Sequence, residues 1–182
     1  MVALPVLALA LPLLVEGHGH GANFCLSNGA GPLPVRCPCQ GVGAVDHGCP
    51  NSEHPGGAGL AIVGALPTNE PVVGVDGLPA GVSCVFVQGS AALLPGVPFG
   101  DGLRCIGGTL LRLAVKPESG GTATYPEGSD LSIYARSAEL GDWIPPGASR
   151  HYQAVYGEPS PTFCPGPTGG PRNATNGLSL VW

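Results

Sequence analysis

Seven cysteines are the residues of this sequence with the clearest chemistry. Their thiols can pair or bind metals, and so many in one chain is typical of an oxidising compartment, such as the outside of the cell. We expect three disulfides among six of them, with Cys84 left as a free thiol. The six paired residues are Cys25, Cys37, Cys39, Cys49, Cys105 and Cys164.

Four of these cysteines lie close together in the segment 25–49. Cys37 and Cys39 are separated by one proline, and a ring so small would be strained, so these two should not pair with each other. Two local pairings remain open: Cys25–Cys37 with Cys39–Cys49, or Cys25–Cys39 with Cys37–Cys49. Each bridge would close a loop of about ten to fifteen residues and contribute roughly 3 kcal/mol.

Cys105 and Cys164 are the expected third bridge, which would close a long loop. A four-thiolate zinc site is the rival for the first four cysteines, but Cys-x-Cys lacks the gap that lets two sulfurs reach one metal. We therefore predict no metal site. Cys84 alternates with Val82 and Phe86 on one face of an apolar strand, which predicts a buried, inert thiol.

In the segment His18-Gly19-His20 near the amino end, His18 could hold copper if the chain were cleaved just before it. An amino-terminal histidine binds copper through its α-amine and ring nitrogen. The opening His-Gly-His-Gly resembles copper-dependent polysaccharide monooxygenases, which are secreted β-sandwiches. A flexible linker is the competing interpretation. The further copper ligand would have to be His47, His54 or His151.

Several aromatic residues could stack on sugar rings if they face outward together. They are Tyr134, Trp143, Tyr152 and Tyr156, with Trp182 at the end of the sequence. This possibility makes a carbohydrate-binding accessory domain the second functional hypothesis, although such aromatics are more often core residues.

The familiar catalytic and cofactor motifs are missing from the sequence, including the nucleophile elbow, the zinc-protease helix motif, the phosphate loop and the dinucleotide fingerprint. The twelve carboxylates are scattered. We therefore expect a non-catalytic protein without a cofactor. The net charge is -5 and the seven Lys and Arg residues are spread singly, which predicts no basic face and no nucleic-acid partner.

The amino end is an apolar run over residues 2–15 that Glu16 and Gly17 terminate. It is too short to span a bilayer as a helix and is typical of a signal-peptide core, yet it lacks the preceding basic residues and a clean cleavage site. The alternative is the remnant of an upstream domain. Either way we expect a secreted or cell-surface protein that does not span the membrane after processing, divided into 1–23, a stapled segment 24–56 and a sandwich 57–182.

Short segments of alternating apolar and polar residues recur between turns rich in Gly and Pro. They predict an all-β fold, a two-sheet antiparallel sandwich of jelly-roll type with a disulfide-stapled, loop-rich amino-terminal segment. One clear case has Leu111, Leu113 and Val115 facing in, with Ala114 and Lys116 facing out. We expect at most one helical turn, over 137–142. The other predicted strands are 60–66, 72–76, 82–88, 131–136, 151–156 and 178–182.

An ordered series of short blocks runs along the chain: Phe24-Cys25, Cys37-Pro38-Cys39, Gly48-Cys49-Pro50-Asn51-Ser52, 99–105, Tyr152-Gln153, Tyr156, Phe163-Cys164-Pro165 and 176–182. This series resembles an uncharacterised Cys- and Gly-rich module found at the carboxyl ends of large secreted bacterial proteins. The resemblance implies an extracellular, β-rich terminal module and no known activity.

Taken together, the sequence predicts a non-catalytic extracellular module for surface attachment or protein interaction. Its expected partner is a cell-surface or extracellular protein or polysaccharide. Carbohydrate binding through the aromatics and copper-dependent oxidation through His18 are the alternatives, in that order.

Overall fold

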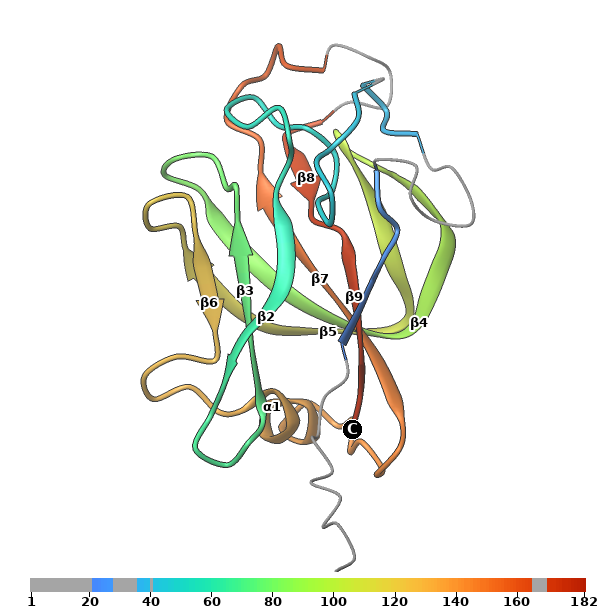
Figure 1. Cartoon of the computed structure of the whole chain (residues 1–182), viewed down its shortest axis with the longest axis vertical. Coiled ribbons are helices and arrows are strands. Elements are labelled where there is room, and N and C mark those ends of the chain that lie inside the picture. The colour runs from blue at the N-terminus through green and yellow to red at the C-terminus, as the bar shows by residue number, and fades with distance from the viewer. Residues whose placement is uncertain (1–20, 28–35, 40, 165–169) are drawn as a thin grey trace, which may run out of the picture.

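A computed structural model describes residues 21–27, 36–39, 41–164 and 170–182, and in this part of the chain two antiparallel sheets face each other (Figure 1). The predicted all-β, two-sheet fold is confirmed. The larger sheet has the order β1-β9-β7-β4-β5, with β8 paired to β7, and the smaller has the order β2-β3-β6. Their bounds are β1 Gly21–Phe24, β2 Gly59–Ala65, β3 Pro71–Asp76, β4 Ser83–Phe99, β5 Gly102–Pro117, β6 Ala123–Tyr125, β7 Ser149–Gly157, β8 Arg172–Ala174 and β9 Gly177–Val181.

The main core lies between the two sheets, where alternate residues of each strand point inward. On β4 the buried apolar side chains include Cys84 and Phe86, and on β3 they include Val73 and Val75. Together with Tyr125 of β6 these side chains belong to one continuous apolar cluster. Period-two patterning in the sequence therefore places one face of each strand in the core, as predicted.

β5 departs from the alternation expected for it. The register with β4 shifts between the pairs Phe86↔Ala114 and Val87↔Arg112, so Leu113 is an extra residue in the ladder, a β-bulge. Because a one-residue slip moves each later side chain to the other face, Ala114 packs against the core and Val115 is 51% exposed. The inward position predicted for Val115 is wrong.

The predicted strand over 131–136 is also wrong, because this segment enters the helix α1, Ile133–Glu139. Ser132 caps the helix, and its hydroxyl accepts a hydrogen bond from the Ala135 amide at 3.2 Å. Arg136 ties α1 to the sheet by donating to the Leu113 carbonyl at 3.1 Å. No helix in the described part of the chain is long and apolar enough to cross a membrane.

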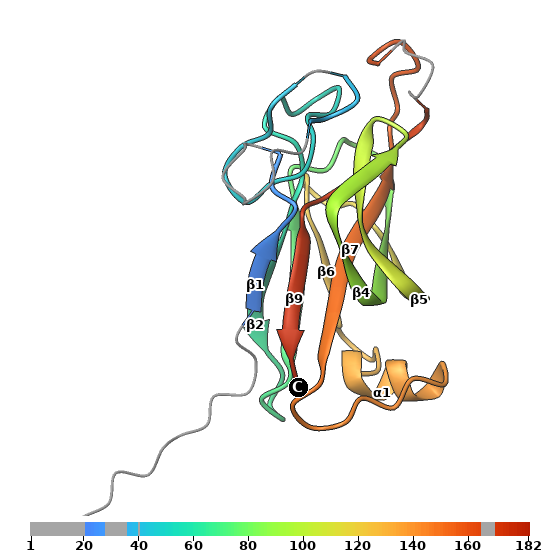
Figure 2. The ribbon, with the colours of Figure 1, turned by 90° about the vertical axis from the view of Figure 1, so that its right-hand side faces the viewer.

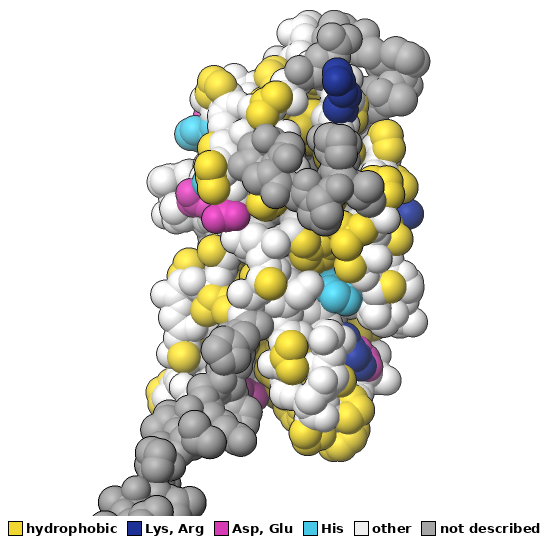
Figure 3. Space-filling model, turned by 45° about the vertical axis from the view of Figure 1, so that its right-hand side comes forward, with side chains coloured by type: hydrophobic (Ala, Val, Ile, Leu, Met, Phe, Trp, Pro, Cys, Tyr) yellow, Lys and Arg dark blue, Asp and Glu magenta, His cyan; other side chains and the backbone are white. Residues whose placement is uncertain are grey.

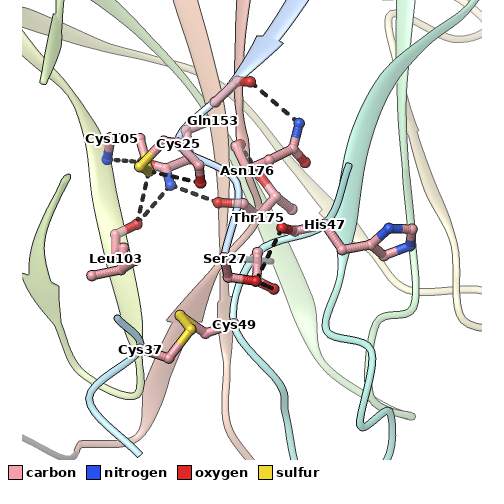
Figure 4. Close-up of a disulfide and its surroundings, with 12 residues drawn as sticks. Cys25, Ser27, Cys37, His47, Cys49, Leu103, Cys105, Gln153, Thr175 and Asn176 are labelled. Atoms are coloured by element: carbon pink, nitrogen blue, oxygen red, sulfur yellow. Dashed lines mark hydrogen bonds between the residues drawn. A yellow bond between two sulfur atoms is a disulfide. The ribbon is translucent and has the colours of Figure 1, made fainter. Parts of the chain in front are cut away.

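Three disulfides form among the six cysteines expected to pair, and Cys84 is free and buried. The connectivity is Cys39–Cys164 together with Cys25–Cys105 and Cys37–Cys49, whose cysteines are labelled in Figure 4. Only Cys37–Cys49 belongs to one of the two local pairings. The predicted Cys105–Cys164 bridge is wrong.

Strand pairing explains why Cys25 forms a disulfide with a cysteine 80 residues away in the sequence. β1 pairs with β9 along its whole length, and it ends at Phe24, directly before Cys25. The sheet thereby carries Cys25 to within 5.9 Å of Cys105, measured between Cα atoms, on β5. β1 also takes in residues 21–23, so the predicted boundary at residue 23 would cut through a strand.

A buried amide also joins the two sheets. Asn176, which precedes β9, accepts a hydrogen bond from the Leu60 amide at 2.7 Å and donates to the Leu60 carbonyl at 3.1 Å. Its side chain thus satisfies the backbone of β2 as a neighbouring strand would. Because Asn176 is fully buried, this pair of hydrogen bonds fixes where the smaller sheet lies on the larger one.

Candidate functional site

An aromatic pocket lies at the end of the sandwich that carries α1 and the carboxyl terminus. Its volume is about 380 Å³, within the range of roughly 300–1,000 Å³ that is usual for small-molecule sites. Figure 3 shows hydrophobic side chains gathered at this lower end of the molecule. The pocket is lined by Thr68, Asn69, Glu70, Pro71, Tyr134, Trp143, Ile144, Pro146, Leu180, Val181 and Trp182.

Three aromatic side chains from separate elements meet at this pocket. Tyr134 comes from α1, Trp143 from the loop after it, and Trp182 from the residue after β9. Trp143 is 62% exposed, and the ring centroids of Tyr134 and Trp182 lie 6.0 Å apart. The exposed apolar surface of Trp143 is in contact with water. A ligand that covers this surface removes it from water and gains hydrophobic free energy of binding.

The turn between β2 and β3 supplies the polar side of the pocket. Asn69 has a φ of 64°, a left-handed conformation that asparagine tolerates, and its amide donates to the Leu66 carbonyl at 2.8 Å. The turn is closed by the Leu66 amide, which donates to the Glu70 carbonyl. Thr68 donates its hydroxyl to the Glu70 carboxylate at 3.0 Å. One hydroxyl, one amide and one carboxylate are therefore available beside the aromatic rings.

A chain of hydrogen bonds holds Trp182 in place. Its indole N–H donates to the Tyr152 hydroxyl at 3.0 Å, and that hydroxyl donates to Gln88 Oε1 at 3.1 Å. Gln88 in turn donates to Asp142 Oδ2 and to the Ser137 hydroxyl, both at 2.8 Å. These hydrogen bonds join Gln88 of β4 to Ser137 of α1 and to Asp142 in the loop after α1. They therefore fix the orientation of the Trp182 ring before any ligand binds.

Asp142 is the charged end of this network. Arg150 donates two hydrogen bonds to its carboxylate, from Nε and Nη2, each 2.7 Å from a carboxylate oxygen. The Arg150 hydrogen bonds hold the pKa of Asp142 below its usual value and raise the pKa of Arg150. Both groups therefore stay ionised at neutral pH, and Gln88 receives a charged, fixed acceptor.

Of the aromatics predicted to face a ligand, two line the pocket and two are buried in the core. Tyr134 and Trp143 line the pocket, together with Trp182. Tyr152 and Tyr156 are each only 2% exposed, and burial raises the pKa of both phenols. The expectation that these two face a ligand is wrong, because they are core residues of β7; Tyr152 instead supports Trp182.

The three described candidates for the second copper ligand lie at two separate places in the fold. His47 and His54 line the same shallow hollow, and the His47 ring lies 3.4 Å from Asp76. His151 is elsewhere: it hydrogen-bonds the Ser179 hydroxyl at 2.8 Å and packs edge-on against Phe24. His18 and His20 lie outside the described residues, so the copper hypothesis stays a prediction.

Cysteine chemistry offers no further site among the described residues. Burial raises the pKa of the Cys84 thiol to about 12, so it is protonated at neutral pH, in line with the inert thiol predicted. Cys39, Asp101 and Cys164 are close enough to surround an ion, but the two sulfurs are joined in a disulfide and offer no thiolate.

Comparison with known proteins found no match: no family model, no curated protein and no solved structure matches the chain. The resemblance to a terminal module of secreted bacterial proteins therefore stays a prediction. The function has to be inferred from the geometry of the chain itself.

Proposed function

We propose that this chain is a non-catalytic extracellular module that binds a carbohydrate in the aromatic pocket and thereby attaches to a polysaccharide-bearing surface. The observation that carries the proposal is the meeting of Tyr134, Trp143 and Trp182 beside the polar turn at Thr68–Glu70. This narrows the prediction of a surface-attachment module to one class of ligand.

The chemistry of a sugar matches both sides of the pocket. A pyranose ring has an apolar C–H face, which packs on the face of an aromatic ring, and hydroxyls around its edge. Trp143 and Trp182 supply the rings, and Asn69 and Glu70 supply hydrogen-bond partners for hydroxyls. Glu70 also introduces a negative charge, so the proposal favours a neutral or amino sugar over an acidic one.

The extracellular part of the proposal rests on the cysteines. Three disulfides persist in oxidising surroundings and are rare in the cytosol. Two of them close loops of 80 and 125 residues, so we expect oxidation to stabilise the fold. A surface-attachment module would carry out its function in such a compartment.

Intrinsic fluorescence gives a direct test, because both tryptophans of the chain line the pocket. Neutral and amino-sugar oligosaccharides, such as cellohexaose, xylohexaose and chitohexaose, are titrated into the oxidised protein. We expect one of them to shift the emission in a saturable way. Trp143→Ala should weaken that binding by at least about tenfold, as buried aromatic anchors do, while Trp143→Phe retains part of it.

Val63→Ala is the matched control, since Val63 is 59% exposed on β2 and lies outside the pocket. It should bind as the parent protein does. Both variants remove an exposed side chain, so the fold should survive in each, which circular dichroism checks. The proposal fails if no oligosaccharide or insoluble polysaccharide binds, or if Trp143→Ala binds as tightly as Val63→Ala.

A further inference from the structure

A second hollow, of about 510 Å³, lies on the outer face of the larger sheet. Val85 and Val87 of β4 and Val155 of β7 line it, and they alternate along their strands with residues that point into the core. Its position is therefore opposite the core and separate from the aromatic pocket, with which it shares no residue. Figure 1 shows the end of the β4–β5 hairpin turned upward at the right of the larger sheet.

Three arginines line this hollow, which we call the arginine groove. Arg104 and Arg112 come from β5, and Arg172 is the first residue of β8. All three are exposed, and none of the residues that line the groove is Asp or Glu. The sequence prediction of no basic face is therefore wrong at this site, because pairing of β8 with β7 brings Arg172 to the residues of β5.

Ion pairing distinguishes these arginines from three of the other four Lys and Arg residues in the described chain; Arg36, which lies outside the groove, also forms no ion pair among the described residues. Lys116, Arg136 and Arg150 each contact at least one carboxylate. Within the same described residues, Arg104, Arg112 and Arg172 form no ion pair. In a protein of net charge -5, three unneutralised guanidinium groups around one hollow form a local positive field that attracts an acidic partner.

Spacing indicates an extended partner instead of a small anion. Arg104 and Arg112 are eight residues apart on one strand, at most about 26 Å at 3.3 Å per residue, and bulges in β5 shorten this span. Guanidinium groups pair with carboxylates through two parallel hydrogen bonds. Several carboxylates along one chain could therefore be engaged together.

The floor of the groove is apolar and aliphatic. Val85, Val87, Val155, Ile106 and Leu110 offer branched methyl groups and no flat ring. The aromatics that line the groove are Phe99, half-buried at its edge, and the buried Tyr156. Such a floor suits alternate side chains of a peptide better than the ring of a sugar.

We propose that the arginine groove binds an extended acidic peptide segment of a partner protein. Carboxylates of the segment pair with Arg104, Arg112 and Arg172, and the apolar side chains between them lie on the valine floor. This gives the module a protein-binding face in addition to the sugar-binding pocket, and it does not depend on that pocket.

Fluorescence anisotropy tests the proposal with a fluorescein-labelled heptapeptide of alternating Glu and Val. The oxidised parent protein should bind it, and raising NaCl from 50 to 300 mM should weaken binding, since salt screens exposed charges. Arg104→Gln, Arg112→Gln and Arg172→Gln should each weaken it by about tenfold. The same peptide with Gln in place of Glu should not bind.

Arg36→Gln is the matched control, because it removes the same charge from an exposed residue outside the groove. It should leave the affinity unchanged, and so should Trp143→Ala, which separates this proposal from the sugar site. Equal binding of the Glu and Gln peptides, or an Arg112→Gln variant that binds like Arg36→Gln, would overturn the proposal. So would binding of labelled polygalacturonate or a single-stranded thymidine oligonucleotide without binding of the peptide.

Discussion

The upper and lower ends of the sandwich are stabilised in different ways. At the upper end in Figure 2, the loops that contain Cys37 and Cys49 bury few apolar side chains, and the small core there is four cysteines and Leu103. At the lower end, α1 covers the sandwich with no disulfide in the described residues. Packing of aliphatic and aromatic side chains and the Gln88 network hold that end instead.

The contrast follows from what each sequence segment can bury. Ordering each residue of a loop costs about 1–2 kcal/mol of backbone entropy, and the glycine-rich segment at the upper end has little apolar surface to offset it. Disulfides lower the entropy of the unfolded chain instead. The lower end has larger side chains, so packing suffices there and leaves Trp143 free for a ligand.

The largest expected effects come from removing a disulfide at the upper end. Cys25→Ser with Cys105→Ser opens a loop of 80 residues and should lower the free energy of unfolding by about 4.5 kcal/mol. Cys37→Ser with Cys49→Ser opens a loop of 12 residues and should lower it by about 2.8 kcal/mol. Urea unfolding followed by circular dichroism measures both, and equal losses would contradict the role given to loop length.

Asn176→Ala should have the next largest effect, because it leaves the buried amide and carbonyl of Leu60 without partners. We expect a loss of about 3 kcal/mol in the free energy of unfolding. Asn176→Asp keeps the acceptor for the Leu60 amide and removes the donor, and it is a control of nearly the same shape. If Asn176→Ala unfolds at the same urea concentration as the parent, the amide does not join the sheets.

At the lower end, Asp142→Asn should cost about 1–2 kcal/mol at pH 7, because it removes the charged acceptor of Arg150 and Gln88. The folded pKa of Asp142 lies below its unfolded value, so its contribution is present above about pH 4 and is lost as pH falls through the folded pKa. Thermal unfolding from pH 7 to pH 2 should show the difference between the parent and Asp142→Asn shrink. A constant difference would show that the ionisation of Asp142 is not the source of the stabilisation.

The smallest expected effect is at Cys84, in the core shared by both ends. Because its thiol is fully buried and its pKa is about 12, Ellman's reagent should not react with the native protein at pH 8. In guanidinium chloride one thiol per chain should react. Rapid reaction of the native protein would mean that β4 opens readily, which the packing around Phe86 argues against.

Local sequence patterns predicted the sheets because each strand's inward face follows from its own residues. They failed where the alternation is ambiguous: Leu131, Ile133 and Ala135 fit a strand, yet Ser132 caps a helix here. The capping serine was the available signal. At Val115 the bulge that reverses the facing of the strand arises from pairing with β4, and the sequence of β5 alone carries no mark of it.

Long-range pairing decided the parts of the site that sequence reasoning missed. Nearby cysteines seemed the natural partners because short loops close easily, but β1 is held by β9, and that sets Cys25 against Cys105. Long-range strand pairing also forms the arginine groove. The sequence alone did not reveal it, since Arg104 and Arg172 are distant in sequence. The aromatics were visible as candidates, but only packing separates the exposed Trp143 from the buried Tyr152.

The disulfides overlap along the chain, since Cys39–Cys164 begins inside the loop that Cys25–Cys105 closes and ends beyond it. Every peptide bond between Cys25 and Cys164 is therefore spanned by at least one bridge. A protease that cuts the exposed turn at Pro67–Asn69, or any other single site in this interval, leaves both products covalently joined. Non-reducing electrophoresis would show one band, and reduction would separate the two fragments.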